Sequence, residues 1–281
     1  MIHTLKKGET SLTTMEASAL DLDAVKEALW IDLLNPTDEE RGLVEKALDL
    51  GLPSKEEMLE IEESSRLFEE DGALFMSCWL LCYDSPIPIN TSVTFVITRN
   101  HFLSIRHSDH HAFRVFSDSK KRKQSRHFRN TGDVYAELMD AAASHIAYTL
   151  RLVEQDLNDL SVEIFAEQKS HVPKSKPAAG LRRVVKRLGK RNSLVASLRE
   201  SSVSLSMITP FFVSNGADWI EAEVSSRLRT IQRDVHSLGE YNGQLSSEIA
   251  FLLDSTVGLI NFEQNQMMKW LGAAAILVAF L

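Results

Sequence analysis

The sequence predicts an α+β protein, in which an N-terminal α/β domain is followed by long antiparallel or coiled-coil helices that lead into a transmembrane helix. Three observations support this fold class. Short strand and helix signals alternate up to about residue 130, apolar residues then recur at steps of three and four, and 270–281 contains no polar side chain. With 12 glycines and 7 prolines among 281 residues, the chain has few turn residues, which disfavours an all-β fold and favours long helices.

Composition and charge narrow the class of protein. Apolar residues make up 44% and charged residues 25%, so the chain can form a core and is not disordered as a whole. The net charge of −8 argues against a nucleic-acid binder, because such domains are normally basic. The first ten residues contain no apolar stretch that could serve as a signal peptide, so most of the chain is expected in the cytoplasm.

The first elements of the α/β domain follow from local signals. Residues 30–34 are a short apolar strand candidate. Thr37 and Glu40 have the spacing of a capping box, in which each side chain bonds the other residue's backbone N–H at the start of a helix. Ser54 and Glu57 repeat this spacing and predict a shorter helix.

Three β-rich runs, at 73–83, 91–98 and 102–107, complete the predicted sheet. Cys78 and Cys82 lie four residues apart on the first run, so their side chains point to one face of the strand. A metal pair is one interpretation. No second Cys/His pair follows nearby at zinc spacing, and we favour buried, small apolar side chains.

From about residue 133 the pattern is helical, with two sustained apolar seams. The seams are Ala136, Met139, Ala143, Ile146, Leu150, Val153, Leu157, Leu160 and Ile164, then Val224, Leu228, Ile231, Val235, Leu238, Asn242, Leu245, Ile249 and Leu252. A less regular helix at 181–212 follows a break at 171–180 and precedes a break at 214–216. Residues 217–281 contain no proline and would form a helix about 100 Å long. We interpret this helix as a stalk that enters a bilayer.

Two basic runs, at 114–129 and 174–191, leave two interpretations open. In the first interpretation, the runs bind anionic lipid or nucleic acid. In the second, they are a solvated loop and the polar face of a helix. Neither run has interleaved aromatic side chains that stack on bases, and we favour the solvated interpretation.

His107, His110 and His111 form a cluster that could ligate a transition metal. Closely spaced histidines at a strand-to-helix junction are more often surface residues, and this is the interpretation that we favour. A hydrolase built on this cluster is a further hypothesis. The sequence contains no glycine-rich phosphate loop and no G-x-S-x-G nucleophile motif, and we expect no enzyme.

One helical stripe in 251–281 carries the functional signal. Asp254, Asn261 and Asn265 recur on it. Its further members are Val257, Met268, Leu271, Ala275 and Ala279. Around a symmetry axis, copies of this stripe would form a carboxylate ring, two amide rings and an apolar throat, which is the layout of a cation pathway. A coiled-coil seam whose polar residues set the register is the alternative, and the stripe alone does not separate the two.

Four segments together resemble the CorA family of divalent-cation channels, including its zinc-transporting relatives. They are WIDLLNPTDEE, EEMLEIEESSRLFEEDGALFMS, VTFVITRNHFLSIRHSD and FLLDSTVGLINFEQNQMMK, in the family's order over nearly the whole chain. The resemblance implies a homopentamer in the inner membrane, with a cytoplasmic α/β funnel, long stalk helices and two membrane helices per subunit. It implies no prosthetic group. The expected partners are further copies of the chain, membrane lipid and divalent metal ions, not nucleic acid.

The resemblance also assigns site residues. Asp254 matches an aspartate ring at the pore mouth. The matching pore-lining positions are Asn261, Asn265, Met268, Leu271, Ala275 and Ala279. Asp84 and Asp234 match an acidic pair through which Mg²⁺ bridges neighbouring cytoplasmic domains and closes the channel. Mg²⁺ is therefore the expected substrate and regulatory ligand, and Co²⁺, Ni²⁺ and Zn²⁺ remain open as substrates.

The expected domains are 1–130 for the α/β part, 131–265 for the helical stalk and 266–281 for the start of the transmembrane helix, with 1–265 in the cytoplasm. A span needs about twenty apolar residues, and the family's G-M-N tripeptide and second membrane helix are not in the sequence. We therefore expect a chain cut within the first membrane helix. It also carries Phe280 where relatives usually have proline. The alternative function is a soluble coiled-coil scaffold whose apolar end is a dimer contact.

Overall fold

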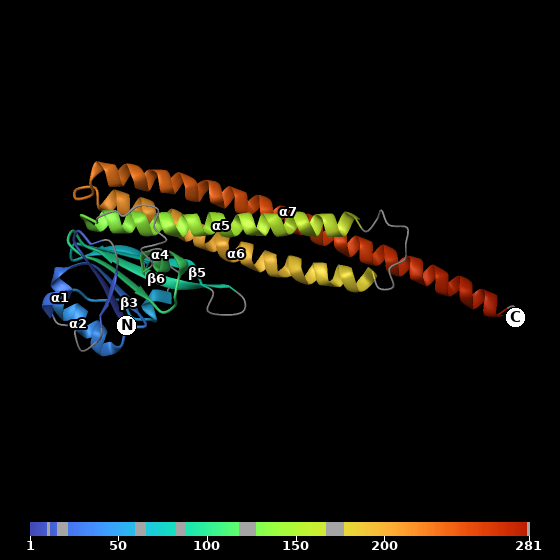
Figure 1. Ribbon diagram of the computed structural model, residues 1–281, viewed down its shortest axis with the longest axis horizontal. Coiled ribbons are helices and arrows are strands. Elements are labelled where there is room, and N and C mark those ends of the chain that lie inside the picture. The colour runs from blue at the N-terminus through green and yellow to red at the C-terminus, as the bar shows by residue number, and fades with distance from the viewer. Residues whose placement is uncertain are drawn as a thin grey trace. The chain divides into compact units, whose positions relative to one another are not determined.

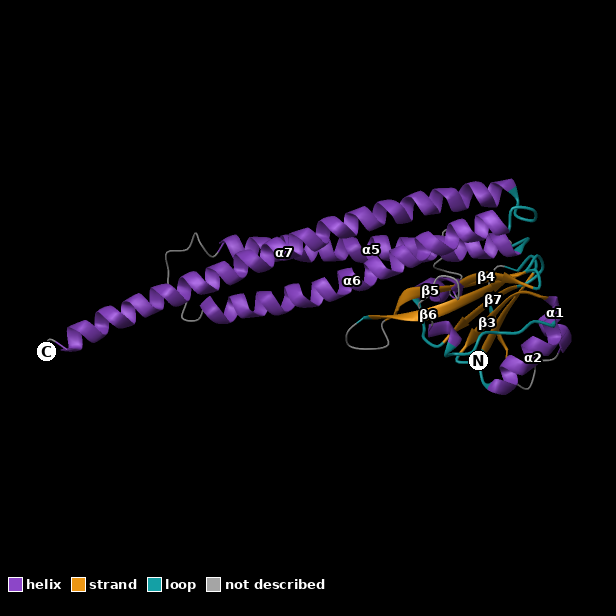
Figure 2. Ribbon diagram, turned by 180° about the vertical axis from the view of Figure 1, so that it is seen from behind, coloured by secondary structure: helices purple, strands orange, loops and turns teal. Residues whose placement is uncertain are grey.

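A seven-stranded sheet with the order β2-β1-β3-β7-β6-β5-β4 forms the N-terminal part of the computed structural model (Figures 1 and 2). The strands are β1 Ile2–Lys6, β2 Thr13–Met15, β3 Ala28–Leu34, β4 Leu67–Glu70, β5 Ala73–Cys82, β6 Ile89–Ile97 and β7 Phe102–Arg106. Neighbouring strands are antiparallel, except β3 and β7, which run parallel. All four predicted strands are confirmed. The structure describes residues 1–9, 12–15, 22–59, 66–82, 88–117, 128–166 and 177–279.

Short helices accompany the strands, and two of them start at the predicted capping boxes. They are α1 Leu22–Glu27, α2 Asp38–Leu48, the 3₁₀ turn η2 Glu57–Leu59 and α4 His111–Ser117. At the start of α2, Thr37 N donates to Glu40 Oε2 at 2.9 Å, and Glu40 N donates to Thr37 Oγ1 at 3.2 Å. Ser54 and Glu57 make the same reciprocal pair. Only the 3₁₀ turn follows this second box among the described residues, because 60–65 lie outside them.

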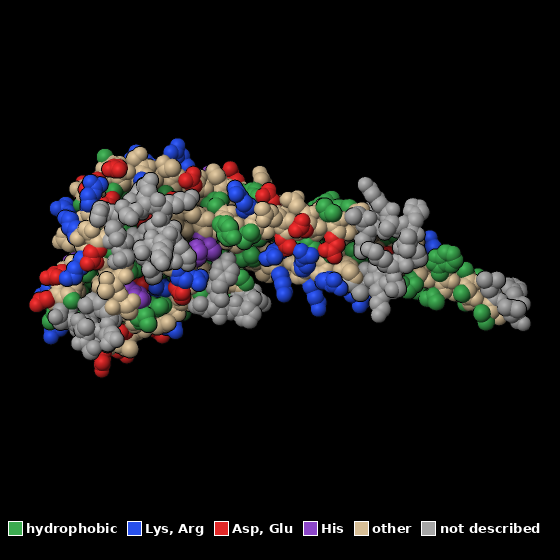
Figure 3. Space-filling model, in the orientation of Figure 1, with side chains coloured by type: hydrophobic (Ala, Val, Ile, Leu, Met, Phe, Trp, Pro, Cys, Tyr) green, Lys and Arg blue, Asp and Glu red, His purple; other side chains and the backbone are tan. Residues whose placement is uncertain are grey.

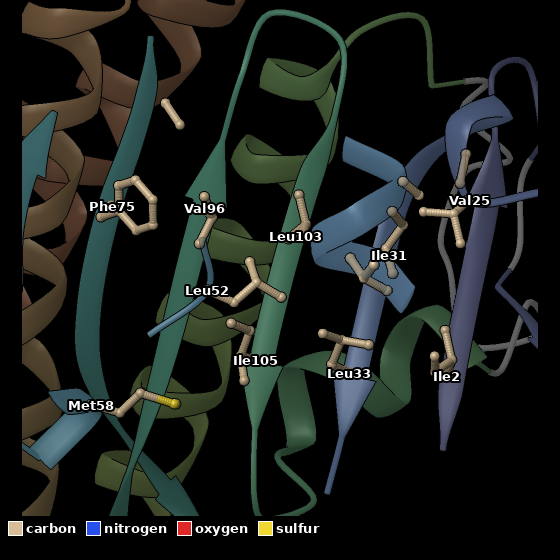
Figure 4. Close-up of a cluster of buried hydrophobic side chains, with 14 residues drawn as sticks. Ile2, Val25, Ile31, Leu33, Leu52, Met58, Phe75, Val96, Leu103 and Ile105 are labelled. Atoms are coloured by element: carbon tan, nitrogen blue, oxygen red, sulfur yellow. The ribbon is translucent and has the colours of Figure 1, made fainter. Parts of the chain in front are cut away.

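The two faces of the sheet bury different kinds of side chain. One face carries mainly aliphatic residues that alternate with a period of two, such as Ile31, Leu103 and Val96, together with Phe75, under the helices α1 and α2 (Figure 4). The other face carries aromatic rings. Trp30 and Phe102 lie with their ring centroids 5.7 Å apart. Successive side chains of a strand point to opposite faces, so neighbouring residues such as Trp30 and Ile31 belong to different faces of the sheet.

Three long helices follow the sheet: α5 Thr131–Ala166, α6 Pro177–Asn215 and α7 Ala222–Ala279. Both predicted seams are confirmed, since every member is buried except Leu238, which is half-buried. The boundaries differ from prediction. Helix α6 begins at Pro177 inside the expected break, because proline fits the first helical position, where no backbone N–H is needed. Helix α7 begins at residue 222, after a turn in which Gly216 N donates to Phe212 O.

The chain forms two compact units, one of residues 1–148 with 197–240 and one of 149–196 with 241–281. Each unit contains a segment of all three long helices, and these segments lie side by side within it (Figures 1 and 2). In the first unit α5 and α6 cover the aromatic face of the sheet, where Tyr135 of α5 lies between Phe95 and Phe212. Burial there raises the pKa of the Tyr135 hydroxyl.

In the second unit, ion pairs join α5 to α6. Arg187 Nη2 lies 2.5 Å from Asp156 Oδ1, and Arg191 Nε lies 2.6 Å from Asp156 Oδ2. Partial burial works to raise the pKa of Asp156, but the hydrogen bonds from both guanidinium groups outweigh it, and the pKa is lowered. Two cations of the basic run at 174–191 are therefore structural. The central part of the other basic run, 118–127, lies outside the described residues.

Candidate functional site

The predicted stripe lies on α7, and the exposure of this helix changes along its length. From Val224 to Thr256 one face is buried against α5 and α6. From Val257 onward every described side chain is exposed or half-buried. Figure 3 shows hydrophobic side chains on the surface of this last stretch. Among the described residues, the fully buried side chains of α7 thus end at Thr256, within the predicted stripe.

The polar members of the stripe share one exposed face of α7. Asp254, Asn261 and Asn265 are all exposed and, at 100° per residue, fall within about 40° of one another. Leu252 and Thr256, two residues to either side of Asp254, are fully buried. Residues two apart on a helix point in nearly opposite directions. The Asp254 carboxylate therefore points away from the helices that cover the buried seam.

The apolar members of the stripe continue this exposed face. Met268 is 69% exposed and Leu271 is 62% exposed, and Val257 and Ala275 are exposed as well. Ala279 belongs to α7, but its side chain lies outside the described part of the structure. An apolar surface of this kind needs cover from lipid or from other protein.

Helix α7 is also the candidate for a membrane span. Among the described residues it is the one helix long and apolar enough to cross a bilayer, judged by its length and composition. Lys269 and Trp270 stand at the start of its apolar end, which suits the interface between lipid and water.

The predicted regulatory acids do not form a site within one chain. Asp234 is an exposed residue of α7. Asp84 lies outside the described residues. Among the residues that the structure describes, no three His, Cys, Asp or Glu side chains come together as a metal site.

The two cysteines are both buried, as we predicted. Burial raises the pKa of the Cys78 thiol to about 12, which favours the neutral thiol that packs as a small apolar side chain.

The expectation for the histidine cluster was wrong in one respect. His110 is buried, not at the surface, because the chain turns back there and pairs with Cys82 at the end of β5. Its Nε2 lies 2.8 Å from Thr91 Oγ1. The His111 ring stacks on His145 of α5 with centroids 4.2 Å apart, and burial lowers the pKa of His145 to about 4. These contacts give His110 and His111 packing roles.

Two of the family-like motifs meet in a buried ion pair. Arg106 Nη2 of β7 lies 2.7 Å from Asp32 Oδ2 of β3, with both side chains almost fully buried. Ser104 Oγ donates to Asp32 Oδ1 at 2.7 Å, and the Arg106 guanidinium lies 4.2 Å from the centroid of the Phe113 ring. The Asp32 carboxylate is thus bound by side chains of its own chain, and it stabilises the sheet where β3 pairs with β7.

The structure adds one pair that the sequence analysis missed. His236 Nε2 and Glu240 Oε1 of α7 lie 3.8 Å apart, and both side chains are exposed. Their signal in the sequence is the spacing of four residues, which places two side chains on the same side of a helix.

Comparisons with known proteins agree on one family. A family model described as "CorA-like Mg2+ transporter protein" matches residues 25–280. The chain is 27% identical over 282 residues to the "Magnesium transport protein CorA" of Mannheimia succiniciproducens, with 99% of this chain and 84% of the relative covered.

Solved structures have a similar fold. The complete CorA magnesium transporter of Methanocaldococcus jannaschii superimposes with a TM-score of 0.72 at 16% identity, over 98% of this chain and 82% of that one. The soluble domain of CorA from the same organism gives a TM-score of 0.71 over 92% of this chain and 97% of that one.

Proposed function

The chain belongs to the family of CorA-like Mg²⁺ transporters, and on this premise we propose that it is one subunit of a homopentameric channel whose main substrate is Mg²⁺. Membership makes the protein a divalent-cation transporter of the inner membrane with a cytoplasmic domain. The pentamer, the preference for Mg²⁺ and gating by cytoplasmic Mg²⁺ are parts of the proposal.

The observation that carries the proposal is the exposed stripe of α7. Asp254, Asn261 and Asn265 share a face that their own chain leaves uncovered. In a ring of subunits around an axis, this face supplies carboxylate and amide oxygens at successive levels. Mg²⁺ loses its water reluctantly, and such oxygens can hold the hydrated ion through its water shell. The apolar residues that follow supply a constriction suited to gating.

The membrane potential supplies enough free energy for uptake. A divalent ion that crosses the membrane gains about 4.6 kcal/mol per 100 mV, twice the value for a single charge. Transport by this route needs no nucleotide hydrolysis.

Gating is proposed to depend on Asp84 and Asp234 of neighbouring subunits. Two carboxylates repel each other without an ion and are bridged when Mg²⁺ binds. Bound Mg²⁺ would then stabilise the closed ring by mass action. Protection of the cytoplasmic part from proteolysis should rise with millimolar Mg²⁺, and Asp234→Ala should weaken that protection. Unchanged protection in both Asp84→Ala and Asp234→Ala would exclude this pair.

Ion flux into liposomes that hold the complete protein tests the function. We expect saturable Mg²⁺ uptake that increases with an inside-negative potential. Asp254→Asn should lower uptake severalfold at low Mg²⁺ and less near saturation, because a carboxylate ring concentrates cations at the pore mouth. Asp218→Asn, which removes another exposed carboxylate from a turn, is the matched control. Identical uptake curves for Asp254→Asn and Asp218→Asn would contradict the assigned role of Asp254.

A further inference from the structure

The pair His236 and Glu240 combines two metal-ligating groups outside the stripe that the proposed function uses. The side chains are 79% and 70% exposed, and their Nε2 and Oε1 atoms lie 3.8 Å apart. His236 is the single histidine in the sequence of α7. An imidazole nitrogen next to a carboxylate oxygen is a ligand set that suits Zn²⁺, Co²⁺ and Ni²⁺.

The geometry of the pair fits one bridging ion. Zinc binds a histidine nitrogen and a carboxylate oxygen at about 2.0–2.2 Å each, so an ion held by both atoms needs them roughly 3–4 Å apart. The observed 3.8 Å lies within this interval. A Cβ added to Gly239 or Gly243 would meet nothing within 4 Å, so these neighbours leave space beside the pair. Water molecules can therefore fill the remaining coordination positions of an ion.

Arg233 lies one turn before His236 on α7. Its Nη2 donates to Thr230 Oγ1 at 3.1 Å, toward the preceding turn. This contact directs the guanidinium along α7 in the direction opposite to Glu240, whose carboxylate lies beside the imidazole.

The spacing along α7 relates the pair to the pore stripe. His236 precedes Asp254 by eighteen residues, which is five turns of roughly 3.6 residues, so both residues occupy the same side of one continuous helix. Val235 and Asn242, next to the pair in sequence, are buried on a different side. By register, His236 thus takes the same helical position as Asp254, and on the proposed function this position belongs to the route of the ion.

We propose that His236 and Glu240 bind a divalent transition-metal ion, with Zn²⁺, Co²⁺ and Ni²⁺ as the ligand class, at a site that does not select Mg²⁺. Mg²⁺ prefers an all-oxygen octahedron, whereas imidazole is a good ligand for the other three ions. Two protein ligands make a weak site, and a site on a conduction route must release its ion. The binding stands on the pair itself, and only its position on the ion route rests on the proposed function.

Histidine modification in the full chain tests the binding. Diethyl pyrocarbonate reacts with exposed imidazole, and peptide mass spectrometry reports the rate at His236. We expect Zn²⁺ alone to slow this reaction and Mg²⁺ alone, at millimolar concentration, to leave it unchanged. Glu240→Gln should shift the protecting Zn²⁺ concentration upward by about tenfold or more, since even outer partners of metal ligands contribute that much affinity. Asp218→Asn should protect like the wild type.

Two results would overturn the proposal: protection of His236 by Mg²⁺ as strong as by Zn²⁺, or unchanged Zn²⁺ protection in Glu240→Gln. Both side chains are exposed, so we expect the variants to fold. A circular dichroism spectrum that matches the spectrum of the wild type verifies this. Uptake into liposomes then tests the position on the route: His236→Asn should change the ratio of Zn²⁺ to Mg²⁺ uptake, and an unchanged ratio would remove the site from the route. A wild-type protein without Mg²⁺ uptake would refute the proposed function while the protection result still decides the binding.

Discussion

Residues 222–256 and 257–276 of α7 belong to one continuous helix, yet only the first stretch contains fully buried side chains among the described residues. In the first, Leu228 and Leu252 are almost fully buried against the other long helices. In the second, Trp270 is 76% exposed and Leu271 is 62% exposed. Both stretches are rich in apolar residues, so hydrophobicity alone does not distinguish a seam inside a subunit from a surface that needs another partner. What distinguishes them is the presence of α5 and α6 beside the first stretch.

The difference also applies to the polar residues. Asn242 is fully buried in the first stretch, where its Nδ2 donates to Val195 O at 3.0 Å. Asn261 and Asn265 are exposed in the second. One amide therefore fixes how helices of the same chain align, and the other two are available to something outside it.

The largest expected contrast is between two leucine truncations. Leu228→Ala should lower the free energy of unfolding by about 2–5 kcal/mol, because it leaves a cavity in a packed seam. Leu271→Ala, in the exposed stretch, should change it by less than about 0.5 kcal/mol. Chemical denaturation of both variants in detergent measures the difference. Equal losses would mean that 257–276 also packs against its own chain.

Replacing buried and exposed asparagines should separate stability from transport. Among the described atoms, Asn242 Oδ1 is buried without a hydrogen-bond partner. Asn242→Leu should therefore increase the free energy of unfolding by about 1 kcal/mol, since a half-satisfied buried amide is removed. Asn261→Leu should leave stability unchanged and reduce Mg²⁺ uptake. Stabilisation by Asn261→Leu in place of Asn242→Leu would reverse the assignment of the two faces.

Acid should weaken the ion pairs between α5 and α6, the helices that lie beside residues 222–256, and lower the free energy of unfolding by a smaller amount. The pKa of Asp156 is lowered in the fold, so its pairing with Arg187 and Arg191 contributes stability that is complete above the usual carboxyl pKa near 4 and lost as the pH falls through the folded value. We expect a loss of roughly 1 kcal/mol, limited by the partial exposure of both arginines. Thermal unfolding below pH 4 should show this loss, and Asp156→Asn should abolish it. A loss centred near pH 6 would indicate a histidine instead.

The smallest effect concerns the glycine at position 258. A Cβ built there meets nothing within 4 Å, so Gly258→Ala should stabilise an unassembled chain by about 0.5–1 kcal/mol through helix propensity. If a neighbouring subunit approaches this glycine closely, the same change should weaken assembly. Light scattering and thermal unfolding of the same samples measure both effects. Destabilisation of an unassembled chain would show that the chain itself contacts this face.

Local periodicity determined most of the secondary structure. The capping box of Thr37 and Glu40, the four strands and the two apolar seams all follow from spacings of two, three or four residues, and the structure confirms them. The stripe of Asp254, Asn261 and Asn265 follows from the same helical period. These features need no knowledge of what lies elsewhere in the chain, because a backbone of known period sets which side chains share a face.

Contacts between distant segments were decided only by the tertiary structure. The pairing of Asp32 with Arg106 requires β3 and β7 to lie side by side, and the burial of His110 requires the chain to return to β5. The sequence by itself determined that α7 carries a polar and apolar stripe. That the side chains of the stripe are exposed follows from how the chain packs around α7, and such packing depends on how the chain folds back on itself, which a local spacing does not encode.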